Sequence, residues 1–418
     1  MMRVVADLNR KAMMTRASVT DTKGWVVVCA GARDSYQAAL ALHQAGLLKT
    51  LVTDLYVPLD KVIPAAACRL LPSSIFSKLE RRFRDGLPSS LVDSHPGYAI
   101  RNWLRPHDWM QRVDGLGRRA GSRAATERYS VLSYSHVATA AFVRVPELPK
   151  VLMQIQPHPA AVKRALASDS FLPEFPHEAG NELTWPAEVF QKFAREPLLA
   201  DLCIAPSKYT RETLTQNGAN SDRVAVIPYG VDVDFFTPAQ ISSDTFTVLF
   251  VGQLSRQKGL HYLLEASRRL RLANAELRIV GELPSNRRAL RAYAVEATFL
   301  GTLDWAALRN EYRRADILCL PSLSEGFGLV VLEAMACGTP VLTTRTCGAA
   351  DLICENKNGF VITAADLDSL MTKLEWASAN REFLRDMRTA ARETAEQYPW
   401  VRFRNALVNT LQSTTITR

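Results

Sequence analysis

The stretch of sequence that decides the fold runs from Pro321 to Pro340 and reads PSLSEGFGLVVLEAMACGTP. A strand end, a polar loop and a glycine turn lead into an apolar helix that opens at about Gly328 and carries one carboxylate, Glu333. The first backbone N–H groups of a helix have no acceptor within it, so they suit phosphate oxygens or sugar hydroxyls. Glycine lets a ligand approach the backbone closely. This stretch therefore predicts a ligand-binding loop at the carboxyl edge of a sheet.

Glu333 shares a helix face with Leu329, Val330 and Cys337, at spacings of four, three and four residues. A carboxylate on an apolar stripe is costly unless a partner bonds it. The two hydroxyls of a ribose would fill that role. A backbone amide or an arginine inside a packed domain would also do so, and Glu325 could equally be a solvated loop residue. Loop chemistry alone leaves these interpretations open.

Size and composition limit the class of protein. The 418 residues are 47% hydrophobic and 22% charged, which predicts a globular chain of two domains. The net charge of +9 favours anionic partners, namely nucleotide diphosphates, an anionic membrane or nucleic acid. No apolar run reaches the length of a membrane-spanning helix, about 18–20 residues. The seven cysteines are scattered singly, which disfavours metal and disulfide scaffolds and fits a reducing, cytoplasmic compartment.

Short apolar runs alternate with helical stretches along the chain, as in βαβ units over a parallel sheet. In the first half the expected elements are strands at Trp25–Ala30, Thr50–Asp54, Val131–Ser135, Val151–Ile155, Leu202–Ala205 and Val224–Ile227, and a helix at Tyr36–Ala45. In the second half they are strands at Thr247–Val251, Leu277–Val280, Thr298–Leu300, Ile317–Leu320 and Pro340–Thr343, and a helical region from about Asp366 to Gln412, interrupted near Pro399.

This alternation predicts two Rossmann-like domains that face each other across a cleft. The expected parts are a flexible leader at 1–23 without a secretory signal, a first domain at 24–230, a linker at 231–244, a second domain at 245–395 and a final helix at 396–418. Residues 56–128 are predicted to be an insertion outside the sheet. They include an arginine-rich helical piece at Phe76–Asp85, which favours a surface helix with ion pairs or, as a second interpretation, peripheral contact with an anionic membrane.

A basic loop follows the first strand of the second half. It contains Gln253, Arg256 and Lys258 before Gly259, where a helix begins. Two cations beside a helix N-terminus concentrate positive potential where a diphosphate would sit. The loop also lies at the carboxyl end of a strand, where open α/β sheets bind ligands. A solvated basic loop is the alternative.

Glu325 and Glu333, with seven residues between them inside EGFGLVVLEAMACGTPV, resemble the E-x7-E motif of retaining glycosyltransferases of family 4. The resemblance covers nearly all of residues 25–412. It implies an α/β GT-B fold in which the second domain holds a nucleotide sugar, the first holds the acceptor, and the final helix crosses back to the first domain. It also implies sugar transfer with retention at the anomeric carbon and without a metal ion.

The same resemblance implies roles for single residues. Lys258, with Arg256, would neutralise the departing diphosphate, and Glu325 would orient the donor sugar. The family usually has arginine where this chain has Gln253, so Arg256 would take over that role or the donor would bind more weakly. His136 is the expected catalytic histidine, with His158 as the alternative and a structural role open for both. The expected contacts of the donor are Gly31, Gln253, Gly281, Leu300, Phe327, Gly328, Leu329, Val330 and Glu333.

The predicted partners are a UDP- or GDP-type nucleotide sugar and a glycan, lipid-linked or small-molecule acceptor, in surface polysaccharide or glycoconjugate synthesis. No separate cofactor is expected. The Asp-x-Asp at Asp232 and Asp234 lies in the interdomain connection, so we do not expect it to bind metal. A non-catalytic or differently reacting GT-B protein is the alternative function. A nucleic-acid-binding protein is disfavoured, because the chain has no recognition helix or stacking module.

Overall fold

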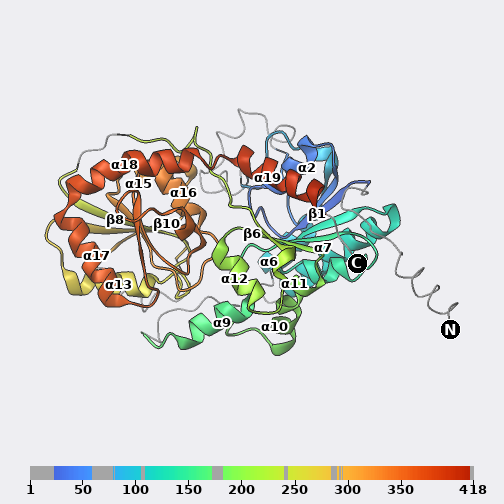
Figure 1. Cartoon of the computed structure of the whole chain (residues 1–418), viewed down its shortest axis with the longest axis horizontal. Helices are drawn as coiled ribbons and strands as arrows, with labels where there is room; N and C mark the ends of the chain where they lie inside the picture. The colour runs from blue at the N-terminus through green and yellow to red at the C-terminus, as the bar shows by residue number, and fades with distance from the viewer. Residues whose placement is uncertain are drawn as a thin grey trace, which may run out of the picture.

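The computed structural model describes residues 23–58, 79, 81–104, 109–171, 182–239, 243–283, 290, 293 and 295–414. Two α/β units lie side by side, one from each half of the chain (Figure 1). Each unit has a parallel sheet with helices on its faces, which confirms the prediction of two Rossmann-like domains. The predicted leader lies outside the described residues except for Lys23.

The first sheet has seven strands in the order β3-β2-β1-β4-β5-β6-β7, all parallel. Its strands are β1 (Trp25–Cys29), β2 (Leu48–Thr53), β3 (Val92–Ser94), β4 (Ser130–Tyr134), β5 (Lys150–Met153), β6 (Leu202–Ala205) and β7 (Val224–Val226). Its helices are α2 (Gln37–Gln44), α6 (Pro96–Leu104), α7 (Trp109–Glu127), α8 (Ala138–Phe142), α9 (Pro159–Ser168), α10 (Ala187–Ala194), α11 (Glu196–Leu199) and α12 (Lys208–Thr215), with 3-10 turns η2 (Ser89–Leu91) and η4 (Ser221–Arg223).

Alternate residues of a strand face opposite layers. In β1, Trp25 and Val27 belong to the core that includes α2, whereas Val26 and Val28 belong to a second core with α7 and α8. Because both faces are covered, the strand reads as one continuous apolar run.

The interpretation of residues 56–128 as an insertion outside the sheet was wrong. Val92–Ser94 forms β3, the edge strand beside β2, and α7 covers one face of the sheet. A three-residue strand is too short to show an alternating pattern, which explains why the sequence did not reveal it. Of the predicted helical piece at 76–85, residues 81–85 form turns and loop. Residues 76–78 and 80 lie outside the described part of the chain.

The second sheet has six parallel strands in the order β10-β9-β8-β11-β12-β13. Its strands are β8 (Phe246–Val251), β9 (Ala275–Val280), β10 (Thr298–Gly301), β11 (Ile317–Leu320), β12 (Val341–Thr344) and β13 (Gly359–Ile362). Its helices are α13 (Leu260–Leu270), α15 (Trp305–Arg314), α16 (Leu329–Ala336), α17 (Leu367–Ala379) and α18 (Arg381–Glu396), with a 3-10 turn η5 (Gly348–Leu352). The strand β13 was not predicted.

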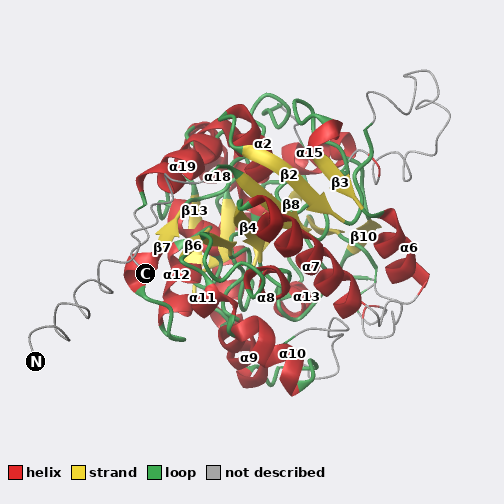
Figure 2. Cartoon of the chain, turned by 90° about the vertical axis from the view of Figure 1, so that its right-hand side faces the viewer, coloured by secondary structure: helices red, strands yellow, loops and turns green. Residues whose placement is uncertain are grey.

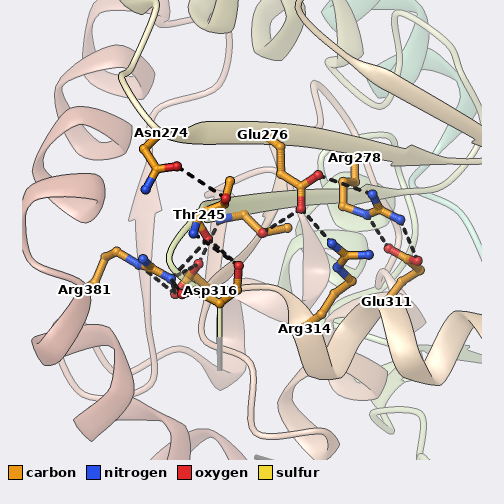
Figure 3. Close-up of polar contacts among 10 residues, drawn as sticks. Thr245, Asn274, Glu276, Arg278, Glu311, Arg314, Asp316 and Arg381 are labelled. Atoms are coloured by element: carbon orange, nitrogen blue, oxygen red, sulfur yellow. Dashed lines mark hydrogen bonds and ion pairs between the residues drawn. The ribbon is translucent and has the colours of Figure 1, made fainter. Parts of the chain in front are cut away.

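Ion pairs join helices α15 and α18 to the second sheet and its flanking loops (Figure 3). The guanidinium of Arg278 on β9 donates to both carboxylate oxygens of Glu311 on α15, at 2.6 and 2.8 Å. Arg381 on α18 donates to Asp316 just before β11, at 3.1 Å. Asp316 also accepts from the backbone N–H of Thr247, at 2.8 Å. In each pair a cation and a carboxylate of the second domain neutralise each other, so we interpret both pairs as structural.

The chain returns to the first domain at its end. Helix α19 (Trp400–Ser413) packs against α2, and Arg404 donates to Gln37 at 2.8 Å (Figure 1). This confirms the predicted crossing helix and the break near Pro399. A second break, at Asn380, separates α17 from α18 and was not predicted. There the side-chain amide of Asn380 donates to the carbonyl of Trp376 at 2.7 Å, which satisfies one of the last carbonyls of α17.

Both chain crossings between the domains run side by side. The backbone N–H of Val231 donates to the carbonyl of Tyr398 at 2.9 Å. A Cβ at Gly230 would lie 2.7 Å from the backbone of Trp400. The ring of Tyr229 packs between Phe327 and Phe403, with centroids 5.6 and 5.5 Å away. Tyr229 thus joins the domain boundary to the loop before α16.

Candidate functional site

The basic loop between β8 and α13 contacts the loop before α16. The ammonium of Lys258 pairs with the carboxylate of Glu325, and their side chains are 19% and 13% exposed. Gln257 anchors the same contact, because its amide donates to the carbonyl of Ser324 at 3.0 Å and its carbonyl accepts from Leu323 at 2.9 Å. The structure therefore brings together the two residues that the sequence predicted as phosphate and sugar contacts.

Gly259 fits between these two loops because it has no side chain. Its φ is 70°, and a Cβ there would lie 1.8 Å from the carbonyl oxygen of Pro321. The close approach sets the start of α13 directly against the end of β11.

We expect Gly259→Ala to destabilise the protein by more than about 2 kcal/mol, because it adds backbone strain and a clash with main-chain atoms. Thermal unfolding measures the change. Gly97→Ala is the matched control, since a Cβ at Gly97 would meet nothing within 4 Å. Equal melting temperatures for Gly259→Ala and the unmodified protein would contradict this account of the loop.

Helix α16 begins as predicted. Its N-cap Gly328 has a φ of 89°, and a Cβ there would lie 3.2 Å from the Sγ of Cys347. The side chain of Phe327 is 2% exposed, and its backbone carbonyl accepts from the N–H of Ala349 at 2.7 Å. Leu329 and Val330 are only partly buried. Their backbone amides, in the first turn, have no acceptor within the helix.

The loop before α16 packs closely against the first domain. A Cβ at Gly326 would lie 2.2 Å from the carbonyl oxygen of Ile155, and the carbonyl of Gly326 accepts from the hydroxyl of Ser207 at 2.7 Å. Tyr209 and Ser324 also share a hydrogen bond of 2.9 Å across the boundary. The predicted sugar-binding loop therefore lies directly at the boundary between the domains.

Glu333 lies on the partly exposed face of α16, with Leu329 and Val330. Its carboxylate accepts a hydrogen bond of 2.7 Å from the hydroxyl of Tyr312 on α15. Burial raises the pKa of Glu333 to about 7, and the Tyr312 hydrogen bond and the charge of Arg81 oppose that rise. Tyr312 is a structural partner that the sequence analysis missed. It satisfies one carboxylate oxygen, and no contact to the other is recorded among the described residues.

The raised pKa of Glu333 makes stability depend on pH. Its folded-state value of about 7 lies above the unfolded value of about 4.3, so protonation favours the folded state. The stabilisation is complete below about pH 4.3 and is lost as the pH rises through about 7. We expect Glu333→Gln to be more stable relative to the unmodified protein at about pH 8 than at about pH 5.

Thermal unfolding at the two pH values tests this expectation. Glu382→Gln, an exposed glutamate on α18, is the control and should show no such pH dependence. A constant difference between Glu333→Gln and the unmodified protein would contradict the proposed burial of the Glu333 charge.

Arg256 lies in a different setting from the one predicted. It is 3% exposed, and its guanidinium donates to the carboxylate of Asp169 in the first domain, at 2.5 and 3.1 Å. The same carboxylate is within hydrogen-bond distance of His261 and Tyr262, each at 2.9 Å. An arginine held in this way fastens the basic loop to the other domain. The expected contact with a departing diphosphate has no support from this placement.

The two candidate histidines have different surroundings. His158 caps α9, where its Nδ1 accepts from Ala160 at 3.1 Å and its Nε2 lies 2.9 Å from the carbonyl of Ala194. These contacts fit a structural role. His136 has a left-handed backbone with a φ of 76°. Burial, assisted by the charge of Arg33, lowers the pKa of His136 to about 3, so its ring is neutral.

One carboxylate, that of Glu196, accepts hydrogen bonds from the backbone around His136. Glu196 accepts from the backbone N–H of His136 at 2.7 Å and from that of Thr139 at 3.0 Å. Arg33 lies close enough to affect both His136 and Tyr229 electrostatically. Tyr229 packs against Phe327. The loop of Arg33, which follows β1, and the loop before α16 therefore lie near the same part of the domain boundary.

The remaining predicted donor contacts lie at strand ends of both sheets. In the first domain, Gly31 donates its N–H to Asp54 at 2.9 Å, and Asp54 also pairs with Arg82. In the second, Gln253 is exposed beyond β8, Leu300 is partly buried on β10, and a Cβ at Gly281 would lie 2.0 Å from the carbonyl of Gly252. That close approach to Gly252 leaves no room for a side chain, which explains why position 281 is a glycine.

Two further residues join the domains here: Arg81, which the sequence placed in the arginine-rich surface piece, and Asp169, which it did not single out. Arg81 of the first domain lies over the ring of Trp305, 5.0 Å from its centroid, and donates to the carbonyl of Leu303 at 3.4 Å. The sequence could not show their contacts with the second domain, because their partners are more than 80 residues away in the chain. Only the folded structure brings them to the site.

Comparisons with known proteins agree with this geometry. Residues 234–394 match the family model of glycosyl transferases group 1. The D-inositol 3-phosphate glycosyltransferase of Pseudarthrobacter chlorophenolicus is 34% identical over 226 residues, which are 49% of this chain and 53% of that protein. The sulfoquinovosyl transferase SQD2 of Arabidopsis thaliana is 31% identical over 217 residues, 48% of this chain and 42% of that protein. The chain thus spans about half the length of these curated relatives.

Solved structures match over nearly the whole chain. Sucrose-phosphate synthase from Thermosynechococcus elongatus has a TM-score of 0.65 at 17% identity, covering 92% of this chain and 97% of that one. HepE from Anabaena, in complex with UDP, has a TM-score of 0.62 at 17% identity, covering 94% and 100%. The fold is therefore the GT-B arrangement of two Rossmann-like domains, and its second domain carries the glycosyl transferases group 1 match.

Within the described residues, no helix has the length and apolar character needed to cross a bilayer. The same residues contain no cluster of three or more metal-ligating side chains. In the connection between the domains, Asp232 accepts from the backbone N–H groups of Asp234 and Phe235 at 3.2 and 3.0 Å.

Proposed function

We propose that this protein is a retaining, metal-independent glycosyltransferase that transfers a sugar from a nucleotide-diphosphate sugar. One observation carries the proposal. Lys258, Glu325 and the start of α16 meet at the carboxyl edge of the second sheet, inside the segment that matches the family model. Positive charge, a carboxylate and free helix amides are the groups that a sugar diphosphate needs.

The proposed roles follow from the placement of each group. The ammonium of Lys258 stabilises charge on the departing diphosphate, and Glu325 turns from Lys258 to a hydroxyl of the donor sugar. Glu333 accepts from the ribose hydroxyls with the carboxylate oxygen that Tyr312 does not engage. Arg256, held by Asp169, keeps the loop of Lys258 in position. His136, neutral and beside Arg33, faces the sugar from the first domain.

The donor is proposed to be a UDP- or GDP-type nucleotide sugar. The HepE structures contain UDP and UDP-glucose, which supports a uridine donor as the first to test. The acceptor is proposed to be a glycan, a lipid-linked sugar or a small molecule, in synthesis of surface polysaccharides or glycoconjugates. The name of one curated relative, a D-inositol 3-phosphate glycosyltransferase, supports including a small phosphorylated molecule among the acceptors to be tested.

Calorimetry with UDP, GDP and their sugars tests the proposal. The unmodified protein should bind one donor tightly, and Glu333→Ala should weaken it about tenfold to a hundredfold, as expected for loss of a hydrogen bond to a charged group. Once an acceptor is found, the anomeric configuration of the product tests retention. Absence of any donor binding, or equal binding by Glu333→Ala, would overturn the assignment of this site.

A further inference from the structure

A hollow of about 630 Å³ lies on the first domain, away from the site described above. Helix α7 forms one wall, and Arg118, Arg119 and Arg123 of that helix line it. Since β4 begins just after α7 ends, this half of α7 lies at the amino edge of the first sheet. The loops of the candidate active site lie at the carboxyl edges. Figure 2 shows α7 on the end of the molecule that faces away from the second domain.

The packing of α7 holds the hollow in shape. A Cβ at Gly117 would lie 2.5 Å from the carbonyl oxygen of Val137, and one at Gly121 would lie 2.6 Å from that of Ala141. These glycines therefore let α8 approach the backbone of α7. The close approach places Arg144, just after α8, at the rim of the hollow, with its guanidinium donating to the carbonyl of Ala140 at 2.9 Å.

The arginines of the hollow have no acidic partners among the residues that the structure describes. Arg118, Arg119 and Arg123 are exposed and take part in no recorded ion pair, and Arg119 and Arg123 are like charges four residues apart on one helix. Such a pair is mutually repulsive. On α13, by contrast, Glu265 pairs with both Arg268 and Arg269.

The sum of charges around the hollow is positive. Four arginines face two carboxylates, those of Asp93 and Glu127. The Nε2 of His95 lies 2.8 Å from the carboxylate of Asp93. The hydroxyls of Ser122 and Thr126, on the same helix face, add neutral donors. Guanidinium groups bind phosphate oxygens in a bidentate manner, so this set of donors suits a phosphate-bearing ligand.

We propose that this hollow, the α7 arginine site, binds a phosphate-bearing group, independently of the nucleotide-sugar site. A phospholipid headgroup and a soluble phosphorylated molecule present the same chemistry, and the experiment separates these two sources. The assignment does not rest on the proposed function, because none of its residues belongs to the donor site.

Calorimetry with inorganic pyrophosphate and co-sedimentation with vesicles test the proposal in the full chain. The vesicles contain phosphatidylcholine with or without phosphatidylglycerol. The test variant is Arg118→Gln/Arg123→Gln, and Arg385→Gln/Lys357→Gln removes two exposed charges from the second domain as a control. Lys258→Ala should weaken binding of pyrophosphate at the donor site, because free pyrophosphate carries the full charge that develops on the diphosphate only as the sugar leaves. All four arginine and lysine side chains of the two double variants are exposed, so both variants should fold.

In Lys258→Ala, pyrophosphate should still bind, and adding Arg118→Gln/Arg123→Gln should weaken it at least about tenfold. Binding of pyrophosphate without vesicle binding would identify a soluble ligand. Vesicle binding that needs phosphatidylglycerol and is lost in the test variant would identify a lipid headgroup. If neither probe binds, or if the test variant binds like the control, the α7 arginine site is refuted. If Lys258→Ala loses donor binding, the proposed function is tested but the α7 arginine site is not. That site is judged only by the further effect of Arg118→Gln/Arg123→Gln.

Discussion

Lys258→Ala should reduce turnover at least about a hundredfold while leaving the fold intact, as when a preorganised group that stabilises transition-state charge is removed. The ammonium is partly exposed at the start of α13 and pairs with Glu325. Its charge would act on the diphosphate more strongly as the bond to the sugar breaks. The loss should therefore appear in kcat more than in the affinity for the donor.

Release of nucleoside diphosphate from the donor that calorimetry identifies gives the turnover number. Lys357→Ala, an exposed lysine near η5, is the matched control and should behave like the unmodified protein. Thermal unfolding of both variants completes the test. Unchanged turnover in Lys258→Ala would remove this residue from the mechanism, and loss of folding would show that the Lys258–Glu325 pair is structural.

Asp169→Ala should give the largest loss of stability. The carboxylate of Asp169 is 1% exposed and meets Arg256, His261 and Tyr262 of the other domain. Removing it leaves the 4% exposed guanidinium of Arg256 without that partner. Breaking a buried pair on one side costs about 3–5 kcal/mol. We therefore expect a clear fall in melting temperature and a loosened contact between the domains.

The same carboxylate predicts a pH dependence. Burial alone would raise the pKa of Asp169, but hydrogen bonds from His261, Arg256 and Tyr262 outweigh burial and hold the pKa well below its usual range. A lowered folded-state pKa stabilises the protein above the unfolded value of about 3.9, and the stabilisation is lost as the pH falls toward the folded value. Asp169→Ala should therefore lose more stability at neutral pH than in acid.

Asp351→Ala is the matched control for Asp169→Ala. Asp351 also joins the domains, by accepting from the backbone N–H of Lys208 at 2.8 Å, but it is exposed. Its removal should cost about 1 kcal/mol or less. Equal losses of stability in the two variants would mean that burial of the Asp169 cluster adds nothing to stability. The interpretation that Arg256 holds the two domains together would then be wrong.

The sequence by itself determined the local units of this protein. Strand cores such as Ile317–Leu320 and the helix that opens at Gly328 were predictable, because each depends on neighbours a few residues away. The resemblance to a known motif placed Glu325 and Lys258 in one site, but it did not predict that the two side chains pair with each other. Short edge strands such as Val92–Ser94 were not predictable, since three residues carry no period.

Only the tertiary structure decided how the charged side chains are used. Arg256 looked like a phosphate ligand because it stands beside Lys258, but Asp169, 87 residues earlier, engages it in a buried cluster. Tyr312 reaches Glu333 from another helix, and Arg33 comes close enough to His136 to lower its pKa only after β1 and β4 pair. Electrostatic interactions depend on distance and burial in space, and these are set by the packing of segments far apart in the chain.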